Sequence, residues 1–446
     1  MPQDKALDLV GDLIAKARRA GADQADAVLF ESVSLSHAQR LGNTEKLERS
    51  ESYDLGLRVF IGKRQAIVST NDRNAQQFEA LVERAIAMAK AVPEDPYCGL
   101  ADPSEIAHAW PDLDMVDATD PAPERLIERA AAAEDAARAV PGVTNSEGAE
   151  ASWGRSRLVL AASNGFSGAY ANTGHGVSVA VLAGEGTGME RDYAYTSAVH
   201  AGDLRDPREV GREAGTRAVR RLGARKVRTC DVPVVYDPRV ASSLLGHLLG
   251  AISGPSVARG TSFLKDKLGQ RIFPAGITIT DEPHKRRGLR SRPFDAEGLA
   301  NHRRAIIEDG VLTTWLLDLA SARQLKLKST GHASRGTSST PSPSPTNLWL
   351  EPGPVTQQEL IGDIMQGFYV TELMGMGVNG VTGDYSRGAA GFWIENGALA
   401  YPVSEVTVAG NLKDMFQRLA AASDLEFKTG IDAPTIRIDG MTVAGA

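Results

Sequence analysis

Cysteine is nearly absent from this chain of 446 residues, which contains only Cys98 and Cys230. Two cysteines so far apart supply neither a CxxC metal knuckle nor a dense disulfide framework, and both are expected to be free thiols. Long hydrophobic runs are also missing, because no stretch approaches the ~18 consecutive apolar residues that a transmembrane helix requires. The sequence therefore excludes a disulfide-rich scaffold and predicts no membrane-spanning helix.

Positive charge is in deficit as well, because the chain has 49 Lys and Arg residues and 56 Asp and Glu residues, which gives a formal net charge of -7. This balance gives no basic field that would attract phosphate backbones, so we expect no nucleic-acid partner. The opening segment carries Asp4, Asp8 and Asp12 within its apolar pattern, which is unlike a signal peptide or a membrane span. A cytoplasmic protein with no membrane partner is expected.

What remains is an ordinary globular composition, with 42% hydrophobic and 24% charged residues. The chain is too long for a single compact core, which favours two domains. The basic run from Arg220 to Arg228 is typical of a linker face, and the strand-like DVPVVY follows it. We therefore predict an N-terminal domain of residues 1–225 and a C-terminal domain of residues 226–446.

The N-terminal half mixes helical and strand patterns. Its opening segment has apolar residues at helical spacing, whereas residues 55–61 alternate and then turn at Gly62 and Lys63, as in a hairpin with one buried face. These patterns predict helices packed on a mixed or antiparallel sheet. Further helices are predicted at 78–89, at 123–140 and from Asp206, and further strands at 143–198 with a turn at Asn164-Gly165.

The C-terminal half is predicted to be largely antiparallel. Asp309-Gly310 and Asn396-Gly397 each separate two alternating runs, and both dipeptides favour the positive φ angles of a two-residue hairpin. Helices are expected from Arg239 to about Ile252 and from Thr356, where Glu359 completes a capping box. Strand runs with separate helices, rather than regular βαβ alternation, indicate an α+β fold in both domains.

Two polar segments are candidates for binding a peptide or a partner. Gly331–Asn347 has the Ser, Pro and Gly content of a mobile surface loop, and Gly383–Gly388 (GDYSRG) is a polar cluster held between glycines. A tight turn with Asp384 and Ser386 bonding the backbone is the structural alternative for the second segment. We expect the two segments to face a shared cavity. The candidate residues are Gly383, Asp384, Tyr385, Ser386, Arg387, Gly388, His332 and Arg335.

Short motifs of two enzyme classes occur in the chain, but the further sequence features that these classes require are missing. Gly375, Gly377 and Gly380 spell GxGxxG, but the following segment is too rich in glycine to open the helix that a pyrophosphate needs. Ser262–Lys265 matches SxxK and Lys428–Gly430 matches KTG, but the third motif of a penicillin-recognising hydrolase is missing. Neither nucleotide binding nor serine hydrolysis is predicted.

A metal site is not indicated by the residues either. Zinc sites use two or three ligands from His, Asp, Glu or Cys, often with two histidines one helical turn apart. None of the eight histidines forms such a pair, and the isolated His247 is more typical of a packed or capping residue. Distant ligands could still converge in space, so the sequence leaves this alternative open.

A long block from Gly377 to Met415 (GVNGVTGDYSRGAAGFWIENGALAYPVSEVTVAGNLKDM) resembles the signature of the TldD/PmbA family, also labelled modulator of DNA gyrase. The resemblance extends to TNLWLEPG at 346–353, VARGTSFLKDKLGQ at 257–270 and the tail APTIRIDGMTVAG. It covers essentially the whole chain. The older label reflects indirect effects on gyrase-directed toxins, which fits the acidic net charge.

In that family the TldD type carries a zinc-binding HExxxH on the helix before the ARGTS-like segment. Leu245, Gly246 and Gly250 stand at those positions here, and FKTGIDAP offers no counterpart for a further cysteine ligand. Leucine and glycine can neither ligate zinc nor accept a proton, so the chain resembles the PmbA type, also called TldE, with no catalytic and no metal-binding residue of its own.

The resemblance implies a heterodimer with a zinc-bearing TldD-type paralogue that degrades unfolded peptides and helps process ribosomally made peptide antibiotics. Zinc is expected only in that partner. This chain would close a chamber and offer an edge strand to an extended peptide. A free-standing metallopeptidase with an atypical site, and a peptide-binding homodimer without enzymatic activity, are the alternatives.

Overall fold

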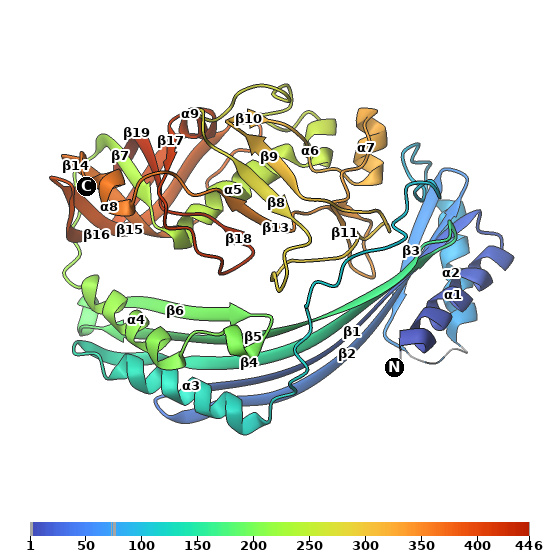
Figure 1. Cartoon of the computed structure of the whole chain (residues 1–446), viewed down its shortest axis with the longest axis horizontal. Coiled ribbons are helices and arrows are strands. Elements are labelled where there is room, and N and C mark those ends of the chain that lie inside the picture. Colours follow the sequence, from blue (N-terminus) through green and yellow to red (C-terminus); the bar gives the residue numbers. More distant parts are fainter. Residues whose placement is uncertain (1–2, 73, 75–76, 446) are drawn as a thin grey trace.

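The computed structural model describes residues 3–72, 74 and 77–445. Its N-terminal part is built on one antiparallel sheet with the strand order β3-β2-β1-β4-β5-β6. The sheet is strongly bent, with its concave side toward the C-terminal part (Figure 1). The strands are β1 (Gln24–Arg40), β2 (Asn43–Ile61), β3 (Arg64–Thr70), β4 (Val143–Ala162), β5 (Ser167–Ala183) and β6 (Glu190–Ala198).

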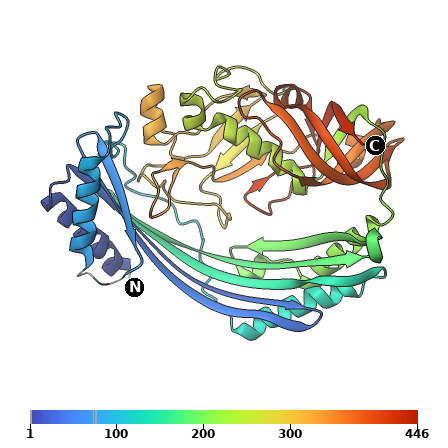
Figure 2. The same ribbon diagram turned by 180° about the vertical axis from the view of Figure 1, so that it is seen from behind.

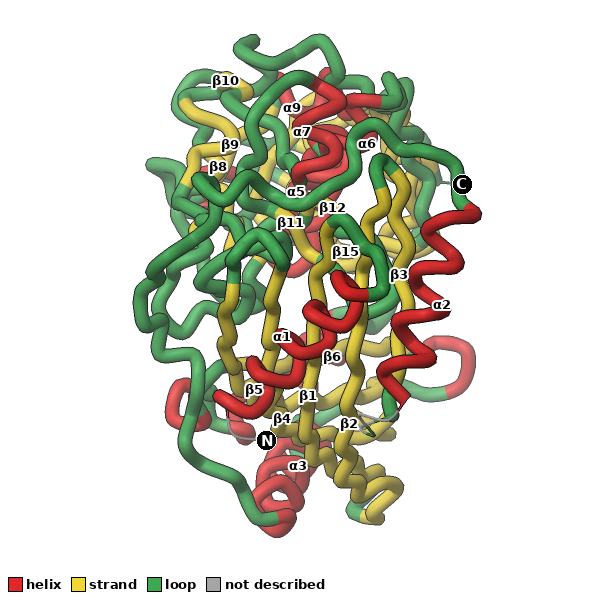
Figure 3. Tube along the Cα trace, turned by 90° about the vertical axis from the view of Figure 1, so that its right-hand side faces the viewer, coloured by secondary structure: helices red, strands yellow, loops and turns green. Residues whose placement is uncertain are grey.

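The helices of this part cover the outer, convex side of the sheet (Figures 1 and 3). Helices α1 (Gln3–Arg19) and α2 (Phe78–Ala91) pack at one end, and α3 (Pro123–Arg138) and α4 (Pro207–Arg220) at the other. A side chain at Gly211 would place its Cβ 2.1 Å from the Ala133 carbonyl oxygen, so this glycine allows α3 and α4 to lie close together. Short 3-10 turns occur at η2 (Gly186–Gly188) and η3 (Ala201–Asp203).

The C-terminal part contains a six-stranded sheet of order β16-β15-β14-β7-β19-β17, in which β16 also pairs with β19 and makes the sheet barrel-like. A five-stranded sheet, β10-β9-β8-β13-β18, and the small pair β11-β12 complete it. Most pairings are antiparallel, but β7–β14 and β13–β18 are parallel. The strands of the six-stranded sheet are β7 (Cys230–Tyr236), β14 (Gln366–Met374), β15 (Asp384–Glu395), β16 (Ala398–Asn411), β17 (Leu419–Ala421) and β19 (Ile436–Ala444). The others are β8 (Ile279–Glu282), β9 (Arg304–Glu308), β10 (Val311–Leu312), β11 (Ala333–Ser334), β12 (Ser342–Pro343), β13 (Asn347–Leu350) and β18 (Ile431–Asp432).

The helices of this part are shorter. They are α5 (Pro238–Ile252), α6 (Gly254–Ala258), α7 (Leu319–Leu325), α8 (Gln357–Ile361) and α9 (Leu412–Gln417). The predicted capping box of Thr356 and Glu359 is confirmed at α8. Within the described residues, no helix is long and apolar enough to cross a membrane.

The α+β prediction is confirmed, and so are both two-residue hairpins. Asp309-Gly310 joins β9 to β10 and Asn396-Gly397 joins β15 to β16, with positive φ at all four residues. Such φ values are accessible to Asp, Asn and Gly at little cost, which is why these dipeptides were informative.

Gly331–Asn347 was predicted to be a mobile surface loop, but it is exposed only around residues 336–342 and is buried at both ends. The segment contains β11 and β12 and lies against the N-terminal sheet, where the Thr337 backbone is so near that a Cβ on Gly56 would come within 2.2 Å of its oxygen. Its Arg335 side chain is 3% exposed and donates a 2.6 Å hydrogen bond to Asp26 of β1. The segment is therefore a packed connection between the two parts of the chain.

Candidate functional site

Helix α5 carries the positions where the resemblance expects a metal motif. It begins at Pro238, after Asp237 caps it by accepting a hydrogen bond from the Arg239 backbone N–H. Proline suits this first position because its missing N–H would have no partner there. One side of the helix is apolar and buried in the C-terminal core, through Ala241, Leu244, Leu245, Leu248, Leu249, Ala251 and Ile252.

The three motif positions do not share a face. Leu245 is 2% exposed and belongs to the buried side, whereas Gly246 and Gly250 are exposed on the other side. A Cβ at either glycine would meet no atom within 4 Å, so the helix surface above them is open. No group of three or more potential metal ligands is present among the described residues.

His247 links α5 to the GDYSRG segment. Its ring lies 5.8 Å from the Tyr385 ring in an edge-on arrangement. Burial lowers the pKa of His247, and the positive charge of Arg387 lowers it further, so the imidazole is neutral at pH 7. Its Nε2 atom is buried and has no hydrogen-bond partner among the described residues. The structure thus brings together the degenerate motif and one of the two candidate segments.

The GDYSRG segment forms the start of β15 rather than a free loop. Asp384 accepts hydrogen bonds from the Asn411 side chain at 3.0 Å and the Thr382 hydroxyl at 2.6 Å, which lower the pKa of its carboxyl group. The Ser386 N–H donates to the Gly377 carbonyl at 2.7 Å. Tyr385 is 2% exposed and belongs to the core, and Gly383 is buried as well, whereas Asp384 and Ser386 are exposed.

His332 and Arg335 have other surroundings. The His332 ring lies 2.8 Å from the Thr330 hydroxyl and 3.4 Å from the Asp281 carboxylate, and is buried. Arg335 binds Asp26, as described above. Asp384 is bonded to Asn411, the residue just before α9, and Figure 1 draws β11 well away from α9. The expectation that both segments face one cavity is therefore wrong, because the first is fixed at the contact between the two parts.

An exposed apolar loop lies next to GDYSRG and was missed by sequence reasoning. Met374, the last residue of β14, is 47% exposed, and in the connection that follows Met376 is 86% and Val381 56% exposed. The loop is well braced, since the Gly380 carbonyl accepts from the Phe263 N–H and a Cβ on Gly377 would come within 2.0 Å of the Ser386 oxygen. Large apolar side chains held in solvent are typical of interaction surfaces. The Met-Gly-Met sequence was the available signal.

A groove between the two parts was also missed. It consists of two cavities of about 250 and 170 Å³ that share Asp432 and follow β6, with Tyr195 lining the first and Ser197 the second. The first also reaches Ser242 of α5. Strand β6 lies at the edge of its sheet. One of its backbone carbonyls, that of Tyr193, accepts a hydrogen bond from the Arg217 side chain. We call this feature the β6 groove.

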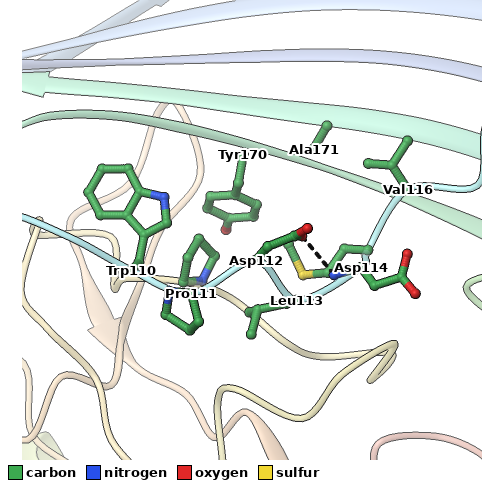
Figure 4. A pocket seen from close by; sticks show the side chains of 10 residues that line it. Trp110, Pro111, Asp112, Leu113, Asp114, Val116, Tyr170 and Ala171 are labelled. Carbon is green, nitrogen blue, oxygen red and sulfur yellow. Dashed lines mark hydrogen bonds between the residues drawn. The ribbon is translucent and has the colours of Figure 1, made fainter.

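A further cavity of about 500 Å³ lies between the connection at 110–116 and strand β5. Figure 4 shows the Trp110 and Tyr170 rings at one end and Asp112, which accepts a hydrogen bond from the Asp114 N–H, in the middle. The Asp114 carboxylate is engaged by Arg287 at 2.6 Å. This cavity contains no nucleophile or metal-ligand cluster and is remote in sequence from α5.

The family comparisons agree with the sequence resemblance. Models of the PmbA/TldA metallopeptidase match as domain 1 at residues 25–89, central domain at 117–222 and C-terminal domain at 229–445. The metalloprotease PmbA of Escherichia coli O157:H7 is 40% identical over 95% of this chain and 92% of its own length. The PmbA homologue of Haemophilus influenzae is 37% identical over 96% and 94%.

Solved structures share the fold. A protein of Bacteroides thetaiotaomicron described as a proposed modulator of DNA gyrase superimposes with a TM-score of 0.92, at 30% identity and full coverage of both chains. TldE of Thermococcus kodakarensis gives a TM-score of 0.87 over 98% of this chain and all of that one. Its sequence is 19% identical, so this second likeness concerns the fold alone.

Proposed function

The chain belongs to the PmbA/TldD metallopeptidase family, and we propose that it acts there as a non-catalytic subunit whose TldD-type paralogue carries the zinc and cleaves the peptide. The observation that carries the proposal is the composition of α5. At the motif positions the helix presents one buried leucine and two exposed glycines. None of these side chains can bind a cation or take a proton from water.

His247 does not replace the missing ligands. Zinc in peptidases is held by three protein ligands with one position left open, and a single imidazole is too few. The charged group that lowers its pKa is Arg387, which is positive and repels a cation. A free-standing metallopeptidase with an atypical site is therefore the less favoured alternative.

The paralogue is expected to contact the Met loop, defined as Met374, Met376 and Val381. Its apolar side chains are large and exposed, and methionine adapts its shape to varied partners. The neighbouring open face of α5 at Gly246 and Gly250 would let a partner segment approach the helix backbone. An interface of the obligate class, over ~2,000 Å² in total, is expected.

The β6 groove is the proposed path of the peptide. An edge strand can pair with an extended chain through main-chain hydrogen bonds, which tolerates many side chains and suits unfolded substrates. Acidic and basic residues both line the groove, including Asp424, Glu426 and Lys428. Precursors of ribosomally made peptide antibiotics belong to this class of substrate, as does any unfolded peptide.

The test is co-expression with the zinc paralogue, followed by size exclusion, elemental analysis and a peptide-cleavage assay. We expect zinc in the paralogue only, cleavage by the complex, and no cleavage by this chain alone. Met376→Asp should prevent co-elution, whereas Met365→Asp, at the other end of β14 and 68% exposed, should not.

Two results would overturn the proposal. One is a paralogue that cleaves unfolded peptide equally well without this chain and elutes separately from it. The other is a stoichiometric zinc in the isolated chain that is lost, together with peptidase activity, in His247→Ala. The second result would establish the free-standing metallopeptidase instead.

A further inference from the structure

Half of strand β2 has a free edge. Strand β3 begins to pair with β2 only at Leu55, and the strand pairing of Asn43–Ser52 is on one side, with β1. Within the described part of the chain no strand lies along the other side. All residues from Asn43 to Ser52 are exposed. The β1–β2 hairpin forms the lower margin of the sheet, in blue (Figures 1 and 2).

The order of charges along this edge is self-complementary. Residues 45–49 read Glu-Lys-Leu-Glu-Arg, so the sign of the charge inverts when the segment is reversed about Leu47. If two copies pair antiparallel with Leu47 opposite Leu47, Lys46 faces Glu48 of the other copy, and Glu45 comes next to Arg49 at the end of the paired segment, so that each contact occurs twice. Opposite charges directly across an antiparallel pair are stabilising, and like charges are destabilising.

We propose that a second copy of this chain pairs with the free edge of β2, antiparallel and centred on Leu47, so that the two N-terminal sheets become one. A two-fold axis between antiparallel strands passes through a residue pair, because the hydrogen-bonded and non-bonded pairs alternate. Centres at Lys46, Glu48 or Arg49 put like charges on the axis. A centre at Ser50 drives the hairpin tip of one copy into the end of β3 of the other. Among residues 46–50, Leu47 is the centre that remains.

The exposure of Leu47 supports the same centre. It is 50% exposed on a strand whose neighbouring residues are polar, and a second Leu47 across the axis would cover it. In the single chain the charges make exposed surface contacts, such as Lys46–Glu48 at 2.7 Å within the strand and Arg49–Asp120 at 3.6 Å with the segment before α3. Contacts of this kind contribute little, so exchanging them for contacts across the axis has little cost.

The edge also carries a bulge, which limits the ladder. Glu45 is an extra residue in β2, because Ala38 pairs with Lys46 and Gln39 with Thr44. Bulges and charged residues commonly protect edge strands from pairing. Here the bulge falls at the end of the complementary segment, and like charges meet in the competing registers. The bulge and the charges therefore disfavour other registers but leave the register centred on Leu47 accessible.

Sedimentation velocity of the full chain across micromolar concentrations tests the pairing. Wild type should form dimers. Glu48→Lys places lysines 46 and 48 opposite each other twice, and should weaken the dimer about tenfold or more. Lys46→Glu should do the same, and the double variant Lys46→Glu/Glu48→Lys should restore the dimer, because the signs are again complementary. The inference does not rest on the proposed function, since the paralogue is absent from this experiment.

A disulfide provides a second readout. Leu47→Cys should form a covalent dimer on mild oxidation, because opposite residues of an antiparallel pair bring their Cα atoms within disulfide range. Leu327→Cys, at a similarly exposed leucine on the C-terminal part, and the wild-type chain should stay monomeric under denaturing conditions. A monomeric wild type, a dimer that Glu48→Lys leaves unchanged, or a double variant that fails to recover would overturn the proposal.

Discussion

Asp26 is the anion on which the contact between the two parts of the chain depends, and Asp26→Asn should lower the free energy of unfolding by about 3 kcal/mol. The carboxylate is buried between two arginines. Arg58 of β2 donates to it at 2.9 Å and Arg335, from the other part of the chain, at 2.6 Å. Burial alone would raise the pKa of Asp26, but these two arginines hold that pKa below its ordinary value.

The magnitude follows from what the substitution leaves behind. Breaking a buried ion pair by removing one partner costs about 3–5 kcal/mol, because the remaining charge is uncompensated. Glu297 also acts electrostatically on both arginines, so a second acidic group stays near them when Asp26 is neutralised. We therefore expect a loss at the low end of the range.

Arg335→Met should cost at most about half as much as Asp26→Asn. Burial lowers the pKa of Arg335, which means that its charge is unfavourably placed, and Asp26 would keep Arg58 as its partner. The control is Asp363→Asn, in an exposed pair with Arg437, which should cost under about 1 kcal/mol.

Urea unfolding at pH 7, followed by tryptophan fluorescence and circular dichroism, measures the three variants. The denaturant slope should stay the same, so that midpoints report stability. The reasoning is refuted if Arg335→Met destabilises as much as Asp26→Asn. It is equally refuted if Asp26→Asn behaves like Asp363→Asn.

Three further predictions concern pH and glycine. Burial, aided by Asp295, raises the pKa of Glu297 from 4.5 to about 8, so the folded chain binds more protons than the unfolded one in this interval. Stability should therefore fall as pH rises through about 8, and Glu297→Gln should flatten the profile measured by urea unfolding. Gly56→Ala should cost about 1–3 kcal/mol in the same assay, because its Cβ would overlap the Thr337 backbone, which cannot rotate away. Gly246→Ala should stabilise the isolated chain by roughly 0.5–1 kcal/mol, since an exposed helical glycine has no neighbour there, and yet weaken binding to the zinc paralogue.

The elements that the sequence predicted are those set by local chemistry. Asp309-Gly310 and Asn396-Gly397 form their hairpins because the required φ angles belong to the dipeptides themselves. The helix predicted from Arg239 to about Ile252 followed from its leucine spacing, and the structure starts it one residue earlier, at Pro238. These features depend on residues close together in the chain, so a single sequence was sufficient.

The features that escaped depend on distant residues. Gly331–Asn347 has the composition of a loop. Its Arg335 side chain is nevertheless buried and hydrogen-bonded to Asp26, which is more than 300 positions away in the sequence. The ring contact between His247 and Tyr385 joins helix α5 to strand β15. The β6 groove exists only because the N-terminal and C-terminal parts of the chain face each other. No local pattern encodes such contacts. The GDYSRG segment was predicted to be a polar cluster or a tight turn, but from Asp384 onward it is a strand, with Tyr385 buried in the core.

Grafting the zinc motif onto α5 tests how deeply the metal chemistry has been lost. Successive residues of an α-helix differ by about 100°, so side chains at 245 and 250 point about 140° apart, and the structure indeed buries one position and exposes the other. Leu245→His would bury an imidazole in the core and remove apolar packing, at a cost of about 2–5 kcal/mol. We expect the triple variant Leu245→His/Gly246→Glu/Gly250→His to be destabilised and to hold no stoichiometric zinc after dialysis. Gly246→Glu/Gly250→His without the core change is the control, and should fold as well as wild type. A folded triple variant with one tightly bound zinc would show that α5 can rotate or deform around a metal, and that only three side chains separate this chain from a metallopeptidase.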